Sequence, residues 1–288
     1  MDGSIYGGAL NSRDLQSNFG DGSASDITAR LVTDAQGFEE SWRLRHAAYS
    51  AQGYIEQSAN GLFMDEYDNY PTSKTVVVYK EGIPVASVRL CLSAPDIGLG
   101  IAKNLPAFKM FPEEIAGVLE SFRGPTRHAR AAEVTRLSRH PDLGNDFEPV
   151  FALFRMVGYL LLESEADAVF SLVCTHHTPF YRRLGFRKLG EPRPYPNLKV
   201  ETALVACVRA PDRALQQALP MLGLVSKDDA NYQAFLAGLH VPVFGTGHVP
   251  TAALSTFERR FEGSKTGLPP GNAWQKAPPR YAHLPLAA

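Results

Sequence analysis

The stretch Glu133-Val134-Thr135-Arg136-Leu137-Ser138-Arg139 decides the fold of this chain. Its Val, Thr and Leu indicate a β-strand, but an acid and two arginines stand among them. A strand buried on both faces should be almost wholly apolar, and one buried on a single face should alternate. Buried charges are costly unless paired, and perturbed charges gather at working sites. We therefore predict a central strand that contributes charged side chains to a functional site.

N-terminal to this strand, the sequence predicts a strand, a helix and a β-hairpin. Ile27–Val32 is the first strand, and Thr33 or Asp34 can cap the helix that follows. An irregular loop over 50–70 then leads to two strands joined by a tight Glu81-Gly82 turn, Thr75–Tyr79 and Ile83–Leu92. The helix has large side chains at helical spacing, interpreted as mostly a core face: Phe38, Trp42, Arg45 and Tyr49.

Apolar patterns predict the remaining elements around and after the central strand. They are a helix from near Pro112, a helix over Phe151–Glu163, a strand over Ala168–Cys174, a short helix over Pro179–Phe186 with a glycine C-cap, and a strand over Val200–Val208. Together they predict a mixed α/β (α+β) fold with one central sheet flanked by helices.

Composition suggests three segments. Residues 1–26 are rich in Gly, Ser, Asn and Asp, which predicts a disordered tail. Residues 27–210 hold the predicted domain. Residues 211–288 are predicted to be an extension with two short helices, Ala214–Leu224 and Tyr232–Leu239, and a loose end rich in Pro and Gly.

The composition and net charge of the chain, and the length of its apolar runs, exclude several classes of protein. The chain is 44% hydrophobic and 20% charged, with a net charge of -1, so it has no basic field for nucleic acid. No apolar run approaches the ~18 residues of a membrane span. No secretory signal is visible, so we expect a cytoplasmic protein.

Cysteine and histidine give no sign of a metal site or of a hydrolase. Cys91, Cys174 and Cys207 each lie in an apolar run, which predicts small buried side chains. His176 and His177 follow Cys174, but neighbouring side chains at the end of a strand should face different ways, so no metal is expected. No G-x-S-x-G elbow for a serine hydrolase is present.

The order of the elements resembles that of the GNAT acyltransferase superfamily. Phe180-Tyr181-Arg182-Arg183-Leu184-Gly185-Phe186 also resembles the aromatic-rich helix that closes against the acyl-carrier side of those enzymes. The resemblance implies a GNAT acyl-CoA N-acyltransferase-like fold, here with a short C-terminal helical extension.

The charged residues resemble one branch, which contains N-acyl amino acid synthases and acyl-homoserine-lactone synthases. That branch has an Arg four residues before an aromatic, a D-x-x-D pair, an R-L in the hairpin and an E-x-x-R. The resemblance covers roughly residues 30 to 205 of this chain. In the same order, the four patterns fall on Arg45 and Tyr49, Asp65 and Asp68, Arg89 and Leu90, and Glu133 and Arg136. The lactone synthases carry a Trp where this chain has Tyr54-Ile55, and the segment between Arg89 and Glu133 is longer here. Both differences favour the N-acyl amino acid synthases.

This resemblance implies transfer of a long-chain acyl group from acyl carrier protein to the α-amine of an amino acid. Glu133 is the expected base, and Leu137, Ser138 and Arg139 belong to the strand that should supply oxyanion donors and meet the donor arm. Arg89 and Arg136 are expected either to hold an acceptor carboxylate or, with Arg45, Asp65 and Asp68, to form a self-neutralising ion-pair network. Two other readings stay open: a lactone synthase that uses S-adenosylmethionine, and a catalytically idle binding module.

No permanently bound cofactor is expected, and the donor is an acyl-phosphopantetheine thioester. Coenzyme A enzymes of this superfamily usually have a Gly-rich turn for pyrophosphate, whereas His140–Asp146 has one Gly and two acids. Acyl carrier protein therefore fits better. Its acidic surface is expected to meet arginines that otherwise form a solvated basic face: Arg123, Arg127, Arg130, Arg182, Arg183 and Arg187.

The spacing of Glu133 and Arg136 makes one geometric prediction. Residues three apart in a regular strand point to opposite faces. The two side chains can share a site only if a β-bulge lies between Glu133 and Leu137.

Overall fold

The computed structural model describes residues 27–93, 104–122, 129–208 and 225–244. The predicted tail over 1–26, the predicted helix Ala214–Leu224 and the end of the chain after residue 244 lie outside these ranges. Arg123 and Arg127 lie outside them as well.

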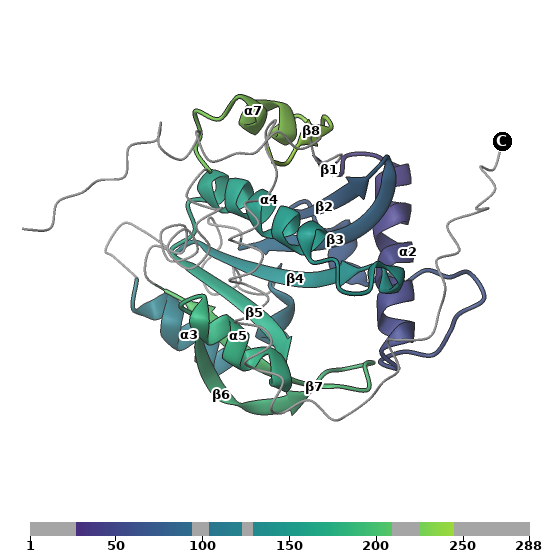
Figure 1. Cartoon of the computed structure of the whole chain (residues 1–288). Helices are drawn as coiled ribbons and strands as arrows, with labels where there is room; N and C mark the ends of the chain where they lie inside the picture. The colour runs from purple at the N-terminus through teal and green to yellow at the C-terminus, as the bar shows by residue number, and fades with distance from the viewer. Residues whose placement is uncertain (1–26, 94–103, 123–128, 209–224, 245–288) are drawn as a thin grey trace, which may run out of the picture.

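The described residues form an eight-stranded sheet in the order β6-β7-β5-β4-β3-β2-β1-β8 (Figure 1). Neighbouring strands are antiparallel except β4 and β5, which are parallel. The predicted mixed sheet is confirmed. The strands are β1 (Ile27–Leu31), β2 (Ser73–Lys80), β3 (Ile83–Leu92), β4 (Ala131–Arg139), β5 (Ala168–Cys174), β6 (Arg187–Pro194), β7 (Glu201–Cys207) and β8 (Val241–Pro242).

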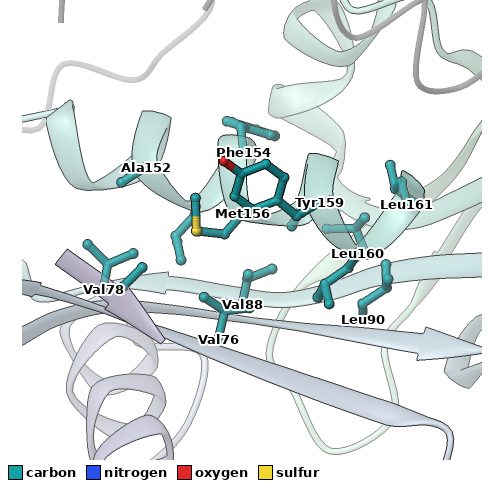
Figure 2. Close-up of a cluster of buried hydrophobic side chains, with 14 of the residues drawn as sticks. Val76, Val78, Val88, Leu90, Ala152, Phe154, Met156, Tyr159, Leu160 and Leu161 are labelled. Atoms are coloured by element: carbon teal, nitrogen blue, oxygen red, sulfur yellow. The ribbon is translucent and has the colours of Figure 1, made fainter. Parts of the chain in front are cut away.

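Helices cover both faces of the sheet. They are α2 (Ala35–Ala51), α3 (Pro112–Glu120), α4 (Glu148–Ser164), α5 (Thr178–Arg183) and α7 (Ala230–Leu236). Helix α4 packs on β1 to β4, and Figure 2 shows Met156 and Leu160 of this helix facing Val76 and Val88 of the sheet. The opposite face carries α2 over β2 to β4, and α3 over the β5 and β7 side.

Alternation along β3 separates the two faces. Val88 and Leu90 join the core under α4, whereas Arg89 and Cys91, which are also fully buried, point to the face of α2 and α3. Glu133 lies opposite Cys91 in the sheet register and so belongs to the second face. The charged side chains of the central strands therefore share one face with α2.

The aromatic stripe of α2 is not its buried face, contrary to the prediction. Phe38 and Trp42 are only half-buried, and they stack with ring centroids 6.0 Å apart. The buried positions are Gly37, Ser41, Leu44 and Arg45. Small residues are needed there, because a Cβ on Gly37 would lie 2.6 Å from the Arg30 guanidinium. The close approach of α2 to the sheet displaces the large rings to its sides.

Two strands were not predicted. β6 contains Gly190, Pro192 and Pro194, and its register with β7 shifts between Leu189 and Arg193. Such an interrupted pattern is tolerated because β6 lies at the edge of the sheet. β8 is only two residues long and pairs with β1. Periodicity cannot detect either element.

The predicted C-terminal helix Tyr232–Leu239 corresponds to α7. Residues 225–244 do not stand apart from the sheet. Tyr232, Phe235 and Val243 are buried in the same core as α4, and β8 extends the sheet beside β1.

Candidate active site

A β-bulge interrupts β4 where the sequence predicted one. Ser87 lies opposite Ser138 and Arg89 opposite Thr135, so Val88 alone faces two residues of β4. One of these two, Arg136, has a φ of 56°, in the left-handed region that is unusual for a residue other than glycine. The bulge restores Arg136 to the face that carries Glu133 and Arg89.

Glu133 is buried completely beneath this bulge. One carboxylate oxygen, Oε2, accepts a hydrogen bond from the Ala107 backbone N–H at 2.8 Å. The other, Oε1, is buried and has no partner among the described residues. Burial raises the pKa of Glu133 to about 7, against the lowering effects of the Ala107 hydrogen bond and of the nearby Arg89 and Arg136 charges. A carboxyl group with such a pKa can take up a proton near neutral pH.

The sheet splits immediately after Glu133. β4 and β5 pair only over Ala131–Glu133 and Ala168–Phe170. The Ser171 hydroxyl then donates to the Val134 carbonyl at 2.8 Å, and β5 continues with β7 alone. Figure 1 shows β4 and β5 diverging along their length. The rest of β4 therefore has no strand partner on this side among the described residues.

Beyond the place where the two strands diverge, the side chains of Leu137, Ser138 and Arg139 make their contacts away from β5. Ser138 hydrogen-bonds Ser87 at 2.9 Å, and Leu137 packs on the core under α4. Arg139 donates to the Asp146 carbonyl at 2.7 Å. This segment of β4 therefore presents its backbone, rather than these side chains, toward β5.

Five of the six predicted charged residues form one bonded network. Arg45 donates to both oxygens of Asp68 at 2.6 and 2.9 Å. Arg89 reaches Asp68 at 2.8 Å and holds both oxygens of Asp65 at 2.6 and 3.0 Å. Arg136 donates twice to Asp65, from Nε at 2.9 Å and from Nη2 at 2.6 Å. Burial tends to raise the pKa of Asp65, but Arg89 and Arg136 outweigh it and hold that pKa well below its usual range.

The D-x-x-D spacing has a local cause. Asp65 precedes the 3-10 turn Glu66–Asn69, and its side chain accepts from the Tyr67 N–H at 2.9 Å. Asp68 reaches back to the Asp65 N–H at 2.9 Å, which completes a capping box. The turn thus fixes both carboxylates toward the buried arginines.

Aromatic rings surround the Arg136 guanidinium. The Phe63 and Tyr195 rings lie 5.1 Å from it and the Tyr49 ring 5.9 Å. The Tyr195 hydroxyl also accepts from Nη2 at 3.1 Å. Phe63 and Tyr195 were not identified from the sequence, because Phe63 lies in an aperiodic loop and Tyr195 follows the unpredicted strand β6.

The expected docking arginines are only partly described. Arg182 and Arg187 are exposed, whereas Arg130 pairs with Glu165 at 2.6 Å. The side chain of Arg183 lies outside the described structure.

The turn before α4 is acidic. Asp146 accepts from the Glu148 N–H at 3.0 Å at the start of α4, and it also pairs with Lys80 at 2.7 Å. The helix terminus that could otherwise attract a phosphate is therefore occupied by a carboxylate.

The two adjacent histidines do not face different ways, contrary to the prediction. They lie in a 3-10 turn, Thr175–His177, rather than at the end of an extended strand, and their ring centroids are 4.1 Å apart. One nitrogen of each imidazole and the Cys174 sulfur lie within 4.8 Å of one another. Cys91 and Cys207 are buried as predicted, but Cys174 is only half-buried and lies 3.5 Å from the Tyr54 hydroxyl.

Comparison with known proteins gives a family match. Residues 40–208 match the model of the family described as N-acyl amino acid synthase FeeM. No curated protein matches the chain significantly. Within the described residues, no helix is long and apolar enough to cross a membrane.

The following solved structures are similar to this chain. FeeM, an N-acyl amino acid synthase from uncultured soil microbes, is 21% identical with a TM-score of 0.53, over 67% of this chain and 97% of that one. The CoA-dependent acyl-homoserine lactone synthase BjaI is 18% identical with a TM-score of 0.48, over 69% and 91% of the two chains. The acyl-homoserine lactone synthase LasI is 14% identical with a TM-score of 0.45, over 76% and 98%.

Proposed function

Since the chain belongs to the FeeM family of N-acyl amino acid synthases, whose members use an acyl thioester and an amine, we propose that it moves a long-chain acyl group from acyl carrier protein to the α-amine of an amino acid. The observation that carries this proposal is the buried Glu133, with a pKa of about 7 and one unpartnered oxygen, at the point where β4 and β5 diverge.

In the proposed reaction the amine nitrogen attacks the thioester carbonyl. A C–N bond forms, and Glu133 accepts the amine proton, directly or through a water. The tetrahedral intermediate then collapses, the C–S bond breaks, and the leaving thiolate takes up a proton. The products are an amide and the free thiol of the carrier. A positioned base contributes roughly 10²–10⁴-fold to such a step.

The backbone of β4 beyond Glu133 is the proposed site for the donor. Because β5 diverges, the pantetheine arm can pair with β4 in the manner of an added strand. Backbone N–H groups of Arg136 to Ser138 are the proposed donors to the oxyanion.

The charged network divides into two roles in this proposal. Both Nη atoms of Arg89 are bonded to Asp65 or Asp68, so Arg89 is assigned to the structural network with Arg45. Arg136 uses Nε and Nη2, whereas its Nη1 has no hydrogen-bond partner within the described residues. We assign Nη1 to the carboxylate of the amino acid acceptor.

Two observations support acyl carrier protein as the donor. The acidic turn at the start of α4 disfavours the pyrophosphate of coenzyme A. The exposed Arg182 and Arg187 favour the acidic surface of a carrier protein.

The decisive experiment incubates the full chain with a long-chain acyl carrier protein and a panel of amino acids, with products identified by mass spectrometry. N-acyl amino acids are expected, and Glu133→Gln should lower kcat roughly 10²–10⁴-fold. Lactones formed with S-adenosylmethionine would instead favour a lactone synthase. No product with either acceptor, and no effect of Glu133→Gln, would favour an idle binding module.

The donor is tested separately by charge reversal. Arg182→Glu should raise KM for the acyl carrier protein and leave KM for acyl-CoA unchanged, because only the carrier contacts the surface of α5. Arg43→Glu, on the exposed side of α2, is the matched control. Equal effects of the two variants on both donors would contradict docking at α5.

A further inference from the structure

A second cluster of reactive side chains lies at the end of β5. Cys174 ends β5, and the 3-10 turn Thr175–His177 follows it at once before α5 begins. This tight turn brings the two imidazoles together and toward the sulfur, so that the three possible ligand atoms lie within 4.8 Å of one another. Both histidines are exposed and Cys174 is half-buried. An ion can therefore reach the cluster from solvent.

The donor set has a clear chemical preference. One thiolate and two imidazoles suit borderline-soft divalent ions such as Zn²⁺. With Zn–S and Zn–N bonds of about 2.3 and 2.1 Å, two ligands of a tetrahedral ion are about 3.4–3.6 Å apart. The observed spread of up to 4.8 Å has to contract by about 1 Å, which side-chain rotation of the exposed histidines can provide.

We propose that Cys174, His176 and His177 bind a divalent transition-metal ion of the zinc class, with water in the fourth position. Binding replaces the thiol proton of Cys174 by a metal–sulfur bond and releases that proton to solvent. No electron transfer is involved.

Tyr54 supports the site from outside the ligand set. Its hydroxyl lies 3.5 Å from the Cys174 sulfur and can donate to the thiolate once the metal has displaced the proton. Hydrogen bonds of this kind orient metal ligands, and their loss usually weakens binding about 10–100-fold. Tyr54 thus gives a test in which the ligands themselves are unchanged.

The test titrates the tag-free full chain with Zn²⁺ by calorimetry and with Co²⁺ by absorption spectroscopy. We expect one equivalent of either ion and, with Co²⁺, a sulfur-to-cobalt charge-transfer band. Cys174→Ser should abolish the band and weaken Zn²⁺ binding by more than about 100-fold, and Tyr54→Phe should weaken it about tenfold.

Matched controls separate this site from other thiols and histidines. Cys207→Ala removes a buried cysteine of β7, and His140→Ala removes a histidine on the loop before α4; both should leave Zn²⁺ affinity unchanged. If Cys174→Ser does not fold, the exposed variants His176→Gln and His177→Gln carry the test. Absence of binding at millimolar Zn²⁺, or equal affinity in all variants, would overturn the proposal.

Discussion

Complete burial suits the Glu133 carboxyl group to its proposed role, and it also makes the ionised form of that group energetically unfavourable. The group has one hydrogen bond, from Ala107, and its pKa is raised to about 7 chiefly because water is excluded. A surface glutamate would be ionised at all neutral pH values but would be a weak base. The burial that suits Glu133 to accept a proton also makes its ionised form unfavourable in the folded protein.

The first consequence concerns rate. We expect the pH dependence of kcat/KM for the amino acid to steepen below about pH 7 by a further tenfold per pH unit, because protonated Glu133 cannot accept the amine proton. Protonation of the acceptor α-amine, which titrates near or above pH 8, already lowers kcat/KM by up to about tenfold per pH unit below that value, so Glu133 is recognised by the additional fall below about pH 7. A profile from pH 5 to 9 checks this. A slope that does not steepen between pH 7 and 5, or the same steepening in Glu133→Gln, would rule Glu133 out as the base.

The second consequence concerns stability. Because the pKa of Glu133 in the folded state is above its ordinary value of 4.5, the folded state binds more protons than the unfolded state between about pH 4.5 and 7, and stability is lost as pH rises through this window. A shift from 4.5 to about 7 corresponds to about 3 kcal/mol. Glu133→Gln cannot ionise but keeps an oxygen for the Ala107 N–H.

Glu133→Gln should therefore match the wild type near pH 4.5 and exceed its free energy of unfolding by up to about 3 kcal/mol at pH 8. Urea unfolding at both pH values measures this difference. A difference that is the same at both would mean that ionisation of Glu133 is not the cause.

Asp65 is the carboxylate shared by two buried arginines. Asp65→Asn removes the charge partner of Arg136 and one of the two partners of Arg89, and should lower the free energy of unfolding by about 3–5 kcal/mol. Glu56→Gln removes an exposed pair with Lys199 and should cost less than about 1 kcal/mol. Chemical denaturation compares the two. Similar small losses would show that the network contributes little to stability.

At the scale of elements, two irregular segments build the site. The bulge in β4 adds one residue and moves Arg136 to the face of Glu133. The 3-10 turn Glu66–Asn69 fixes Asp65 and Asp68 as mutual caps. Neither segment fits a regular helix or strand, and each redirects a charged side chain.

Backbone conformation at the β2–β3 turn can be tested without changing any contact. Gly82 has a φ of 75° and Gly117 lies within α3, and a Cβ at either position meets nothing within 4 Å. Gly82→Ala should lower the free energy of unfolding by about 1–2 kcal/mol, since it forces an L-residue into the left-handed region. Gly117→Ala should stabilise by about 0.5–1 kcal/mol. Thermal unfolding of the pair measures both, and equal shifts would contradict this account.

At the scale of the whole molecule, the sheet has a paired half and a split half. β1 to β4 form a continuous antiparallel sheet under α4, whereas β5 to β7 leave it after Glu133. The segment 225–244 returns to the far edge, where β8 pairs with β1 and α7 packs on β1.

This arrangement predicts that residues 225–244 unfold together with the sheet. Phe235 of α7 is fully buried in the core under α4, so Phe235→Ala should lower the free energy of the main unfolding transition by about 3–5 kcal/mol. Intrinsic fluorescence and far-UV circular dichroism should report one coincident transition. A separate early transition, with the main one unchanged, would show that the segment folds independently.

The sequence by itself determined the order of the principal helices and strands and most of the charged site. Hydrophobic periodicity is local and strong in β2 to β5, α4 and β7, and a charge such as Arg89 or Glu133 inside an apolar run stands out without any structure. Even the bulge followed from sequence, because residues 133 and 136 are out of phase with a strand.

Only the tertiary structure decided which charges pair, which face of α2 is buried, and where β6, β8, Phe63 and Tyr195 lie. These features depend on contacts between residues far apart in the chain, such as Arg136 with Asp65 and Tyr54 with Cys174. The same holds for His176 and His177: their juxtaposition depends on a tight turn that the flanking elements impose. Local pattern shows that a charged or reactive residue is unusual, whereas packing decides what it meets.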